Sequence, residues 1–178
     1  MVPPGGMSGG YRGNRPPMRG GSGPSSSRDA APASASLRPK KRVLFVCIGN
    51  AIRSQMAEAF ARAYGSDVLA PDSAGLSPAT MIPPLTTQIL RERNIRMDGQ
   101  FPKGIEMMRD PYDLVVNLSG QRLNLPGARI LEWPVPDPIG QTEPVFRAAA
   151  NHIEGLVMKL ILELRAAALT APARPGEA

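Results

Sequence analysis

Short apolar runs alternate with helical patterns along most of the chain. We predict strands at the four apolar runs, which are residues 43–46, 67–70, 113–118 and 129–133. Between and after them, composition and apolar spacing predict helices at 54–64, 83–93 and 142–169, with a short helix at 104–109. Strands that alternate with helices form parallel sheets. The pattern therefore predicts one α/β domain, a four-stranded, parallel, doubly wound sheet with helices on both faces.

Two of the predicted helices have clear ends or faces. Pro83 and Pro84 are suited to start the second helix, and Asn94 is suited to end it. In the last helix, which Thr142 is expected to cap, the apolar side chains recur at helical spacing. These side chains, which we expect to pack on the sheet, are Phe146, Ala149, Ile153, Leu156, Leu160 and Leu164.

Composition separates the first part of the chain from the rest. Residues 1–42 hold seven Pro and eight Gly and carry eight Lys or Arg against one Asp, a net charge of +7. The remaining 136 residues carry thirteen basic and fourteen acidic groups, a net charge of −1. We predict a disordered tail at 1–40, a domain at 41–169 and a frayed terminus at 170–178. Arg-Gly fragments leave a weak nucleic-acid contact by the tail as an alternative to a purely solvated extension.

The counts of cysteine and histidine narrow the chemistry. The single Cys47 fits a reducing compartment and excludes an internal disulfide, and the single His152 gives no support to a histidine metal cluster or a Ser-His-Asp triad. No apolar stretch has the length of a signal peptide core or a membrane span. We therefore predict a cytoplasmic protein with no metal, no other cofactor and no membrane partner.

The candidate chemistry lies in the loop between the first strand and the first helix. Cys47 begins this loop, Gly49 and Asn50 accept unusual backbone angles, and Arg53 and Ser54 end it. Such a loop gathers unpaired backbone N–H groups and the positive end of a helix, so it suits an anion. It also favours the thiolate of Cys47, which Ser54 is placed to stabilise with a hydrogen bond. A cysteine ending an apolar strand is otherwise a small buried hydrophobe.

The sequence Cys47-x5-Arg53-Ser54 after a short strand, with a later Asp137-Pro138, resembles the low-molecular-weight protein tyrosine phosphatases. Arsenate reductases of the thioredoxin-coupled type share the same fold and loop. The resemblance extends from residue 41 to about residue 165. It implies that Asp137 is the general acid and base, and that Ser73 forms a hydrogen bond with Asn50.

The resemblance also implies how the phosphate loop works. Cys47 would attack phosphorus, Arg53 would hold the phosphoryl oxygens, and the rest of the loop would surround the substrate. The substrate-binding residues expected on this basis are Ile48, Gly49, Asn50, Ala51, Ile52 and Ser54. The predicted activity is a cysteine-dependent phosphomonoester hydrolase that forms a cysteinyl-phosphate, with a phosphorylated protein or a small phosphomonoester as partner.

Two alternatives stay open at this point. Ile139 and Gly140 stand where phosphatases of this type often carry aromatic residues, and Trp133 with Gln55 resembles the arsenate reductase branch more closely. That branch needs further thiols, which segment 117–120 lacks, so only an arsenate reductase that uses an external small thiol remains. The second alternative is a phosphate-binding domain without catalysis.

Overall fold

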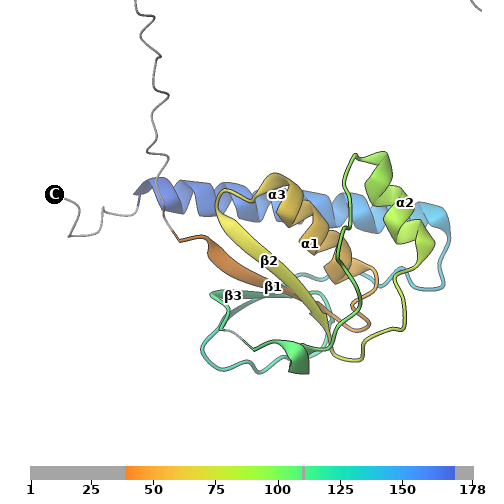
Figure 1. Cartoon of the computed structure of the whole chain (residues 1–178), viewed down its shortest axis with the longest axis horizontal. Coiled ribbons are helices and arrows are strands. Elements are labelled where there is room, and N and C mark those ends of the chain that lie inside the picture. The colour runs from red at the N-terminus through yellow and green to blue at the C-terminus, as the bar shows by residue number, and fades with distance from the viewer. Residues whose placement is uncertain (1–38, 110, 171–178) are drawn as a thin grey trace, which may run out of the picture. The chain divides into compact units, whose positions relative to one another are not determined.

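The computed structural model describes residues 39–109 and 111–170 (Figure 1). The strands are β1 (Lys41–Cys47), β2 (Leu69–Gly75), β3 (Leu114–Asn117) and β4 (Arg129–Glu132). The α-helices are α1 (Arg53–Tyr64), α2 (Pro84–Glu92) and α3 (Glu143–Thr170), and η1 (Ile105–Met107) is a one-turn 3-10 helix. Thr170, which was predicted to begin the frayed terminus, is the last residue of α3. The predictions for the tail before residue 39 and for residues 171–178 lie outside the described residues.

The four strands form one parallel sheet in the order β2-β1-β3-β4, which confirms the predicted sheet. The chain moves from β1 to one side, to β2, and then crosses to the other side, to β3 and β4. The order therefore reverses at β1. In open parallel sheets, ligands bind outside the carboxyl end of the strands at such a reversal. The loop that follows β1, from Cys47 to Arg53, occupies this position.

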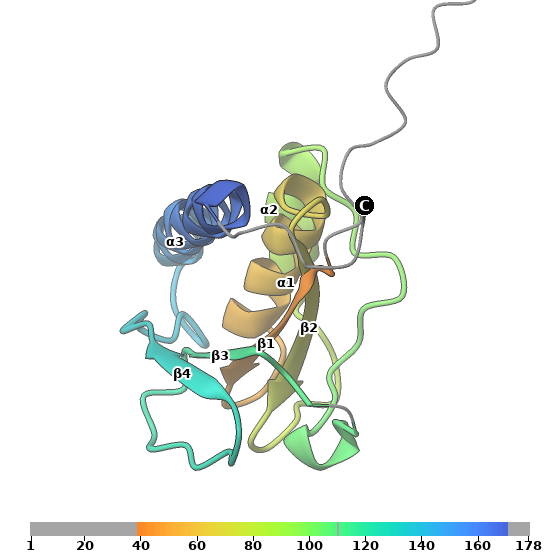
Figure 2. The same ribbon diagram turned by 90° about the vertical axis from the view of Figure 1, so that its left-hand side faces the viewer.

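The two faces of the sheet are covered differently. Val43 and Phe45 of β1 join a core with side chains from α1, α2 and α3, so all three α-helices lie on one face (Figure 2). Leu44 and Val46 lie on the other face, where η1 and irregular segments cover them. Helices are therefore present on both faces, as predicted, but the second face carries only the one-turn helix η1. Pro126 and Gly127 interrupt the connection between β3 and β4, which disfavours a helix there.

Strand β2 begins and ends later than predicted. We expected a strand at 67–70, but residues Leu69–Gly75 pair in register with the whole of β1. Hydrogen bonds to β1 stabilise the extended backbone and outweigh the weak strand preference of Pro71, Ser73 and Gly75. Pro71 is tolerated because β2 is an edge strand.

Helix α3 packs along α1 and α2 through its apolar stripe. Phe146, Ala149, Ile153 and Leu160 are buried, and Leu156 and Leu164 are partly buried against the same core. At one edge of this contact, the Tyr64 hydroxyl donates to Glu154 at 2.8 Å. Among the described residues, no helix is both long enough and apolar enough to cross a membrane.

Replacement of Tyr64 by Phe should reduce the alkaline sensitivity of the fold. Burial, followed by the hydrogen bond to Glu154, raises the pKa of Tyr64 to about 12. A raised pKa contributes stability that is present below the unfolded value of about 10 and is lost as the pH rises toward the folded value. The urea midpoint of the wild type should fall more than that of Tyr64→Phe between about pH 9 and about pH 11. If the urea midpoint falls equally with pH in both proteins, the ionisation of Tyr64 is not linked to folding.

Candidate active site

The loop after β1 turns its carbonyl groups to one side. Amides of segment 76–79 donate to the carbonyl oxygens of Cys47, Ile48 and Gly49, at 3.1, 2.9 and 2.8 Å. In a planar trans peptide the N–H points opposite to the C=O of the same unit. The N–H groups of Ile48, Gly49 and Asn50 therefore point away from segment 76–79. Together with the first amides of α1, which have no acceptor within the helix, they provide donors for an anion.

Two backbone features allow this turn. Asn50 has a φ of 47°, in the left-handed region that asparagine tolerates better than most residues, whereas Gly49 does not adopt a positive φ. Helix α1 begins at Arg53, one residue earlier than predicted, and no side chain caps it. The uncapped amino end of α1 thus lies directly after the loop, where a bound anion would take the place of a cap.

Gly75 lets the end of β2 approach the loop closely. A Cβ atom at this position would lie 2.7 Å from the carbonyl oxygen of Ile48 and 2.9 Å from the amide nitrogen of Asn50. Both contacts are with backbone, which cannot move aside without changing the loop. The role of this glycine is therefore to allow a close approach between two segments.

Gly75→Ala should weaken oxyanion binding, because the added methyl group forces the loop outward. We expect a cost of about 1–3 kcal/mol in unfolding free energy. If half of that cost falls on the loop, inhibition by phosphate should be weaker by about twofold to about twelvefold. Gly155→Ala is the matched control, since a Cβ at Gly155 meets nothing within 4 Å. Equal phosphate inhibition in both variants would contradict this role of Gly75.

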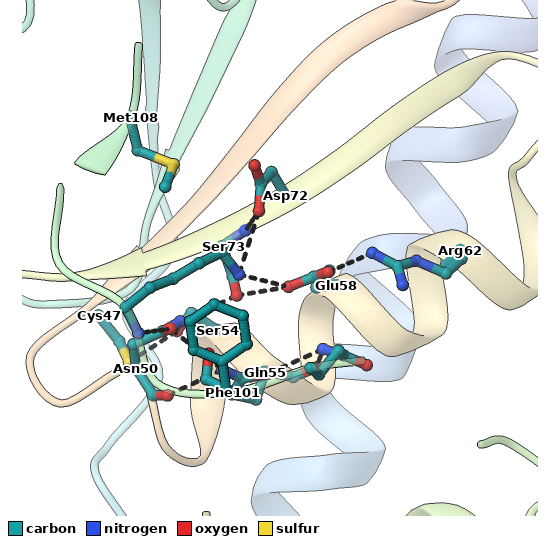
Figure 3. Close-up of polar contacts among 12 residues, drawn as sticks. Cys47, Asn50, Ser54, Gln55, Glu58, Arg62, Asp72, Ser73, Phe101 and Met108 are labelled. Carbon is teal, nitrogen blue, oxygen red and sulfur yellow. Dashed lines mark hydrogen bonds and ion pairs between the residues drawn. The ribbon is translucent and has the colours of Figure 1, made fainter. Parts of the chain in front are cut away.

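The predicted site residues around the sulfur lie together (Figure 3). Cys47 is buried, and its Sγ lies 2.9 Å from Ser54 Oγ. The Asn50 side-chain amide donates to Ser54 Oγ and to Ser73 Oγ, each at 2.9 Å. This places Ser73, which comes from β2, in the position that the resemblance implied. Ala51 and Ile52 are also buried, so the loop offers its backbone rather than these side chains.

Arg53 and Asp137 meet at the other side of the loop. Arg53 is 4% exposed, and its NH1 donates to the carbonyls of Leu118 and Val135 at 2.7 and 3.0 Å. Its NH2 forms an ion pair with Asp137, although the two residues lie far apart in the sequence. The Asp137 side chain is 35% exposed and also accepts from the amide of Ile139 at 3.1 Å.

One donor of Arg53 has no acceptor. Its Nε is buried and has no hydrogen-bond partner among the described residues. A buried N–H without an acceptor is costly, so this atom calls for an explanation. An oxyanion held by the loop amides would supply the missing acceptor, and its negative charge would be balanced by the guanidinium.

The structure adds three residues that the sequence did not predict as part of the site. Gln55 Nε2 donates to the carbonyl and the side-chain oxygen of Asn50, both at 3.0 Å. The amide of Lys103 donates to the same side-chain oxygen at 2.8 Å, and Lys103 Nζ lies 3.5 Å from the buried carboxylate of Glu58. A signal for Glu58 was present, because a charged residue stands among alanines on the buried side of α1. Nothing in the sequence connected segment 100–104 to the loop.

The fold and this loop together define an α/β protein with a phosphate-type loop around one cysteine. A family model described as low molecular weight phosphotyrosine protein phosphatase matches residues 42–128. The chain is also 35% identical over 130 residues to a glutaredoxin arsenate reductase from Synechocystis sp.. This match covers 70% of this chain and 98% of that protein. The chain therefore belongs to the low-molecular-weight phosphotyrosine protein phosphatase family, which includes arsenate reductases of the same fold.

Solved structures agree with this assignment. An arsenate reductase in the phosphate-binding state matches with a TM-score of 0.64 at 35% identity, covering 70% of this chain and 98% of that chain. A low molecular weight protein tyrosine phosphatase from T. tengcongensis matches with a TM-score of 0.59 at 26% identity, covering 70% of this chain and 99% of that chain. The family is thus one of enzymes, and the proteins named here include both arsenate reductases and a phosphatase.

Proposed function

We propose that this protein is a cysteine-dependent phosphomonoester hydrolase that works through a cysteinyl-phosphate intermediate. The observation that carries the proposal is the buried Nε of Arg53, which lacks an acceptor at the end of a loop whose amides point away from segment 76–79. Cys47 lies at the start of this loop, and the carboxyl group of Asp137 contacts the same guanidinium. A nucleophile, an oxyanion site and an acid are the groups that this hydrolysis needs.

In the first step the Cys47 thiolate attacks phosphorus in line with the leaving oxygen. The S–P bond forms and the P–O bond to the leaving group breaks, while Arg53 and the loop amides hold the three remaining oxygens. The dianionic phosphoryl group of the bound substrate competes with the Asp137 carboxylate for the ion pair with Arg53. The displaced Asp137 binds a proton and passes it to the leaving oxygen.

In the second step water releases the phosphate. The Asp137 carboxylate takes a proton from water, the water oxygen bonds to phosphorus, and the S–P bond breaks. The electron pair returns to the sulfur, where the Ser54 hydroxyl at 2.9 Å stabilises the thiolate. Free phosphate leaves, and Asp137 is left protonated for the next cycle.

The surroundings of Asp137 bear on the substrate. Ile139, which follows the acid, is 60% exposed, and Gly140 comes next with a φ of 70°. Neither residue offers an aromatic surface for a phenyl ring. We therefore propose a phosphorylated protein or a small phosphomonoester as the substrate, without a requirement for phosphotyrosine.

A second candidate function is arsenate reduction with an external small thiol. The similarity to a glutaredoxin arsenate reductase favours it, and arsenate has the shape and charge of phosphate. The carbonyl of Leu118 contacts Arg53, so segment 117–120 lies against the loop, yet Cys47 is the only cysteine in the chain. Two small-thiol molecules would then have to supply the two electrons and end as a disulfide.

Trapping the adduct on Cys47 distinguishes these reactions. In one reaction the full chain is mixed with an aryl phosphate, and in the other with arsenate and either glutathione or mycothiol. Both reactions are quenched in acid, and the mass of the peptide that contains Cys47 is measured. Hydrolase chemistry predicts a phosphoryl adduct on the peptide with Cys47 and steady release of the phenol. Reductase chemistry predicts arsenite release and a mixed disulfide on Cys47. Phosphate binding with neither adduct would indicate a binding domain and contradict both functions.

A further inference from the structure

Helix α3 carries a second apolar face on the side opposite to the core. One side of the helix packs on the core through Ile153, Val157 and Leu160. On the opposite side, uncharged residues recur every three or four positions. These residues, which we call the outer seam, are Ala148, Asn151, Gly155, Met158, Leu162, Ala166 and Leu169. The outward face of a surface helix is ordinarily charged or polar, so a largely apolar outward face is typical of a helix that packs on both sides.

The outer seam is open to solvent in the single chain. Leu162 is 58% exposed and Leu169 is 86% exposed, whereas Met158 is half-buried. A Cβ atom at Gly155 would meet nothing within 4 Å, so the middle of the seam is open as well. Figure 2 shows α3 nearly end on, with α1, α2 and the sheet to one side of it. A second helix can therefore lie along the outer seam without displacing these elements.

Two residues of opposite charge border the outer seam. Lys159 and Glu163 are exposed and four positions apart, so they lie on the same flank of the seam. Neither side chain has a hydrogen bond or an ion pair with another described residue. Lysine before glutamate is also the less favourable order for a pair within one helix. Both charges are thus available to a partner that presents the complementary pattern.

The same helix from a second copy of the chain presents this pattern when it runs antiparallel. A two-fold axis between two antiparallel helices brings the same flank of each helix together. If the axis crosses the seam at residue 161, Lys159 lies level with Glu163 of the second copy, and the reverse pair forms on the other side of the axis. The four charges then alternate in sign. This self-complementary pattern favours a second copy over a partner with charge of one sign, such as an anionic membrane.

The apolar residues of the outer seam fit the same register. The two Leu162 side chains meet beside the axis. Leu169 falls between Asn151 and Gly155 of the second copy, where glycine leaves space for the leucine side chain. Ala166 lies almost level with Gly155 of the second copy, and two such small residues let the helices approach closely.

We propose that this protein forms an antiparallel dimer through the outer seams of two α3 helices. The overlap spans residues 151–170 of each copy, a contact about 30 Å long. A single helix from each copy buries less than the about 800 Å² per partner of a standard stable interface. The dimer is therefore weak, with a dissociation constant on the order of tens of micromolar. The dimer does not depend on which reaction Cys47 performs.

The first test is sedimentation of the full chain at increasing concentration. We expect monomer at about 5 µM and mainly dimer at about 500 µM. Lys159→Glu and Glu163→Lys each place like charges level across the axis, and each should weaken the dimer by about tenfold. Mixing the two variants restores both opposite-charge pairs, so the mixture should associate about as tightly as the wild type.

Three results would overturn the proposal. The wild type could remain monomeric at the higher concentration, which would assign the outer seam to no partner or to a different one. Either variant could associate as tightly as the wild type, which would place the dimer contact elsewhere. The mixture could associate no better than each variant alone, which would contradict the reciprocal pairing of Lys159 with Glu163.

Disulfide cross-linking tests the antiparallel arrangement. In a Cys47→Ser background, Leu162→Cys places two thiols beside the axis, and mild oxidation should join the copies. Leu169→Cys is the matched control, because sixteen helical positions separate its two thiols by about 24 Å, beyond the reach of a disulfide. Equal cross-linking of both variants, or none in Leu162→Cys, would contradict the antiparallel dimer.

Discussion

Cys47→Ser should abolish turnover of an aryl phosphate while phosphate still binds. A serine hydroxyl at this position is a far weaker nucleophile than a thiolate, and we expect a fall in kcat on the order of 10⁴-fold or more. The loop amides and Arg53, which bind the oxyanion, are unchanged by the substitution. Phosphate affinity, measured by calorimetry, should therefore stay within about threefold of the wild type.

The chain offers a matched control for this variant. His152 is the only histidine in the chain, it is exposed on α3, and an imidazole nitrogen can accept a phosphoryl group. His152→Gln should leave turnover unchanged. Full turnover in Cys47→Ser, or its loss in His152→Gln, would end the mechanism proposed here. Loss of phosphate binding together with turnover would instead indicate that the loop had collapsed.

Asp137→Asn should slow the release of a poor leaving group much more than that of a good one. A general acid contributes about 10²–10⁴-fold when the leaving oxygen needs a proton. A nitrophenolate needs little help, whereas an alkyl alkoxide needs a full proton. The measurement is the dependence of kcat/KM on the acidity of the leaving alcohol, which should become steeper in the variant.

Glu143→Gln is the control for Asp137→Asn, because Glu143 is a nearby exposed carboxylate that pairs with Arg147 on the surface. Surface pairs of this kind contribute little, so turnover should not change. Equal losses for good and poor leaving groups in Asp137→Asn would contradict the acid role. Such a result would point to Asp137 as a support for Arg53, with which it forms an ion pair.

Much of the fold was predictable because its signals are local. Runs such as 43–46 and 113–118 are apolar enough to identify buried strands, and the apolar stripe from Phe146 to Leu164 identified a helix that packs on the core. Strand β2 was misjudged, since Pro71, Ser73 and Gly75 have weak strand preference by themselves. Pairing with β1 along its whole length made them a strand.

The site divides in the same way. The spacing of Cys47, Arg53 and Ser54 is a property of one short loop, so the sequence by itself determined that a nucleophile, a cation and a hydroxyl belong together. The positions of Asp137, Lys103 and Glu58 depend on tertiary contacts, because they come from segments far apart in the chain. Only the tertiary structure decided that Glu58 is buried behind Ser73, since donor and acceptor pairing depends on distances and directions that a linear pattern does not contain.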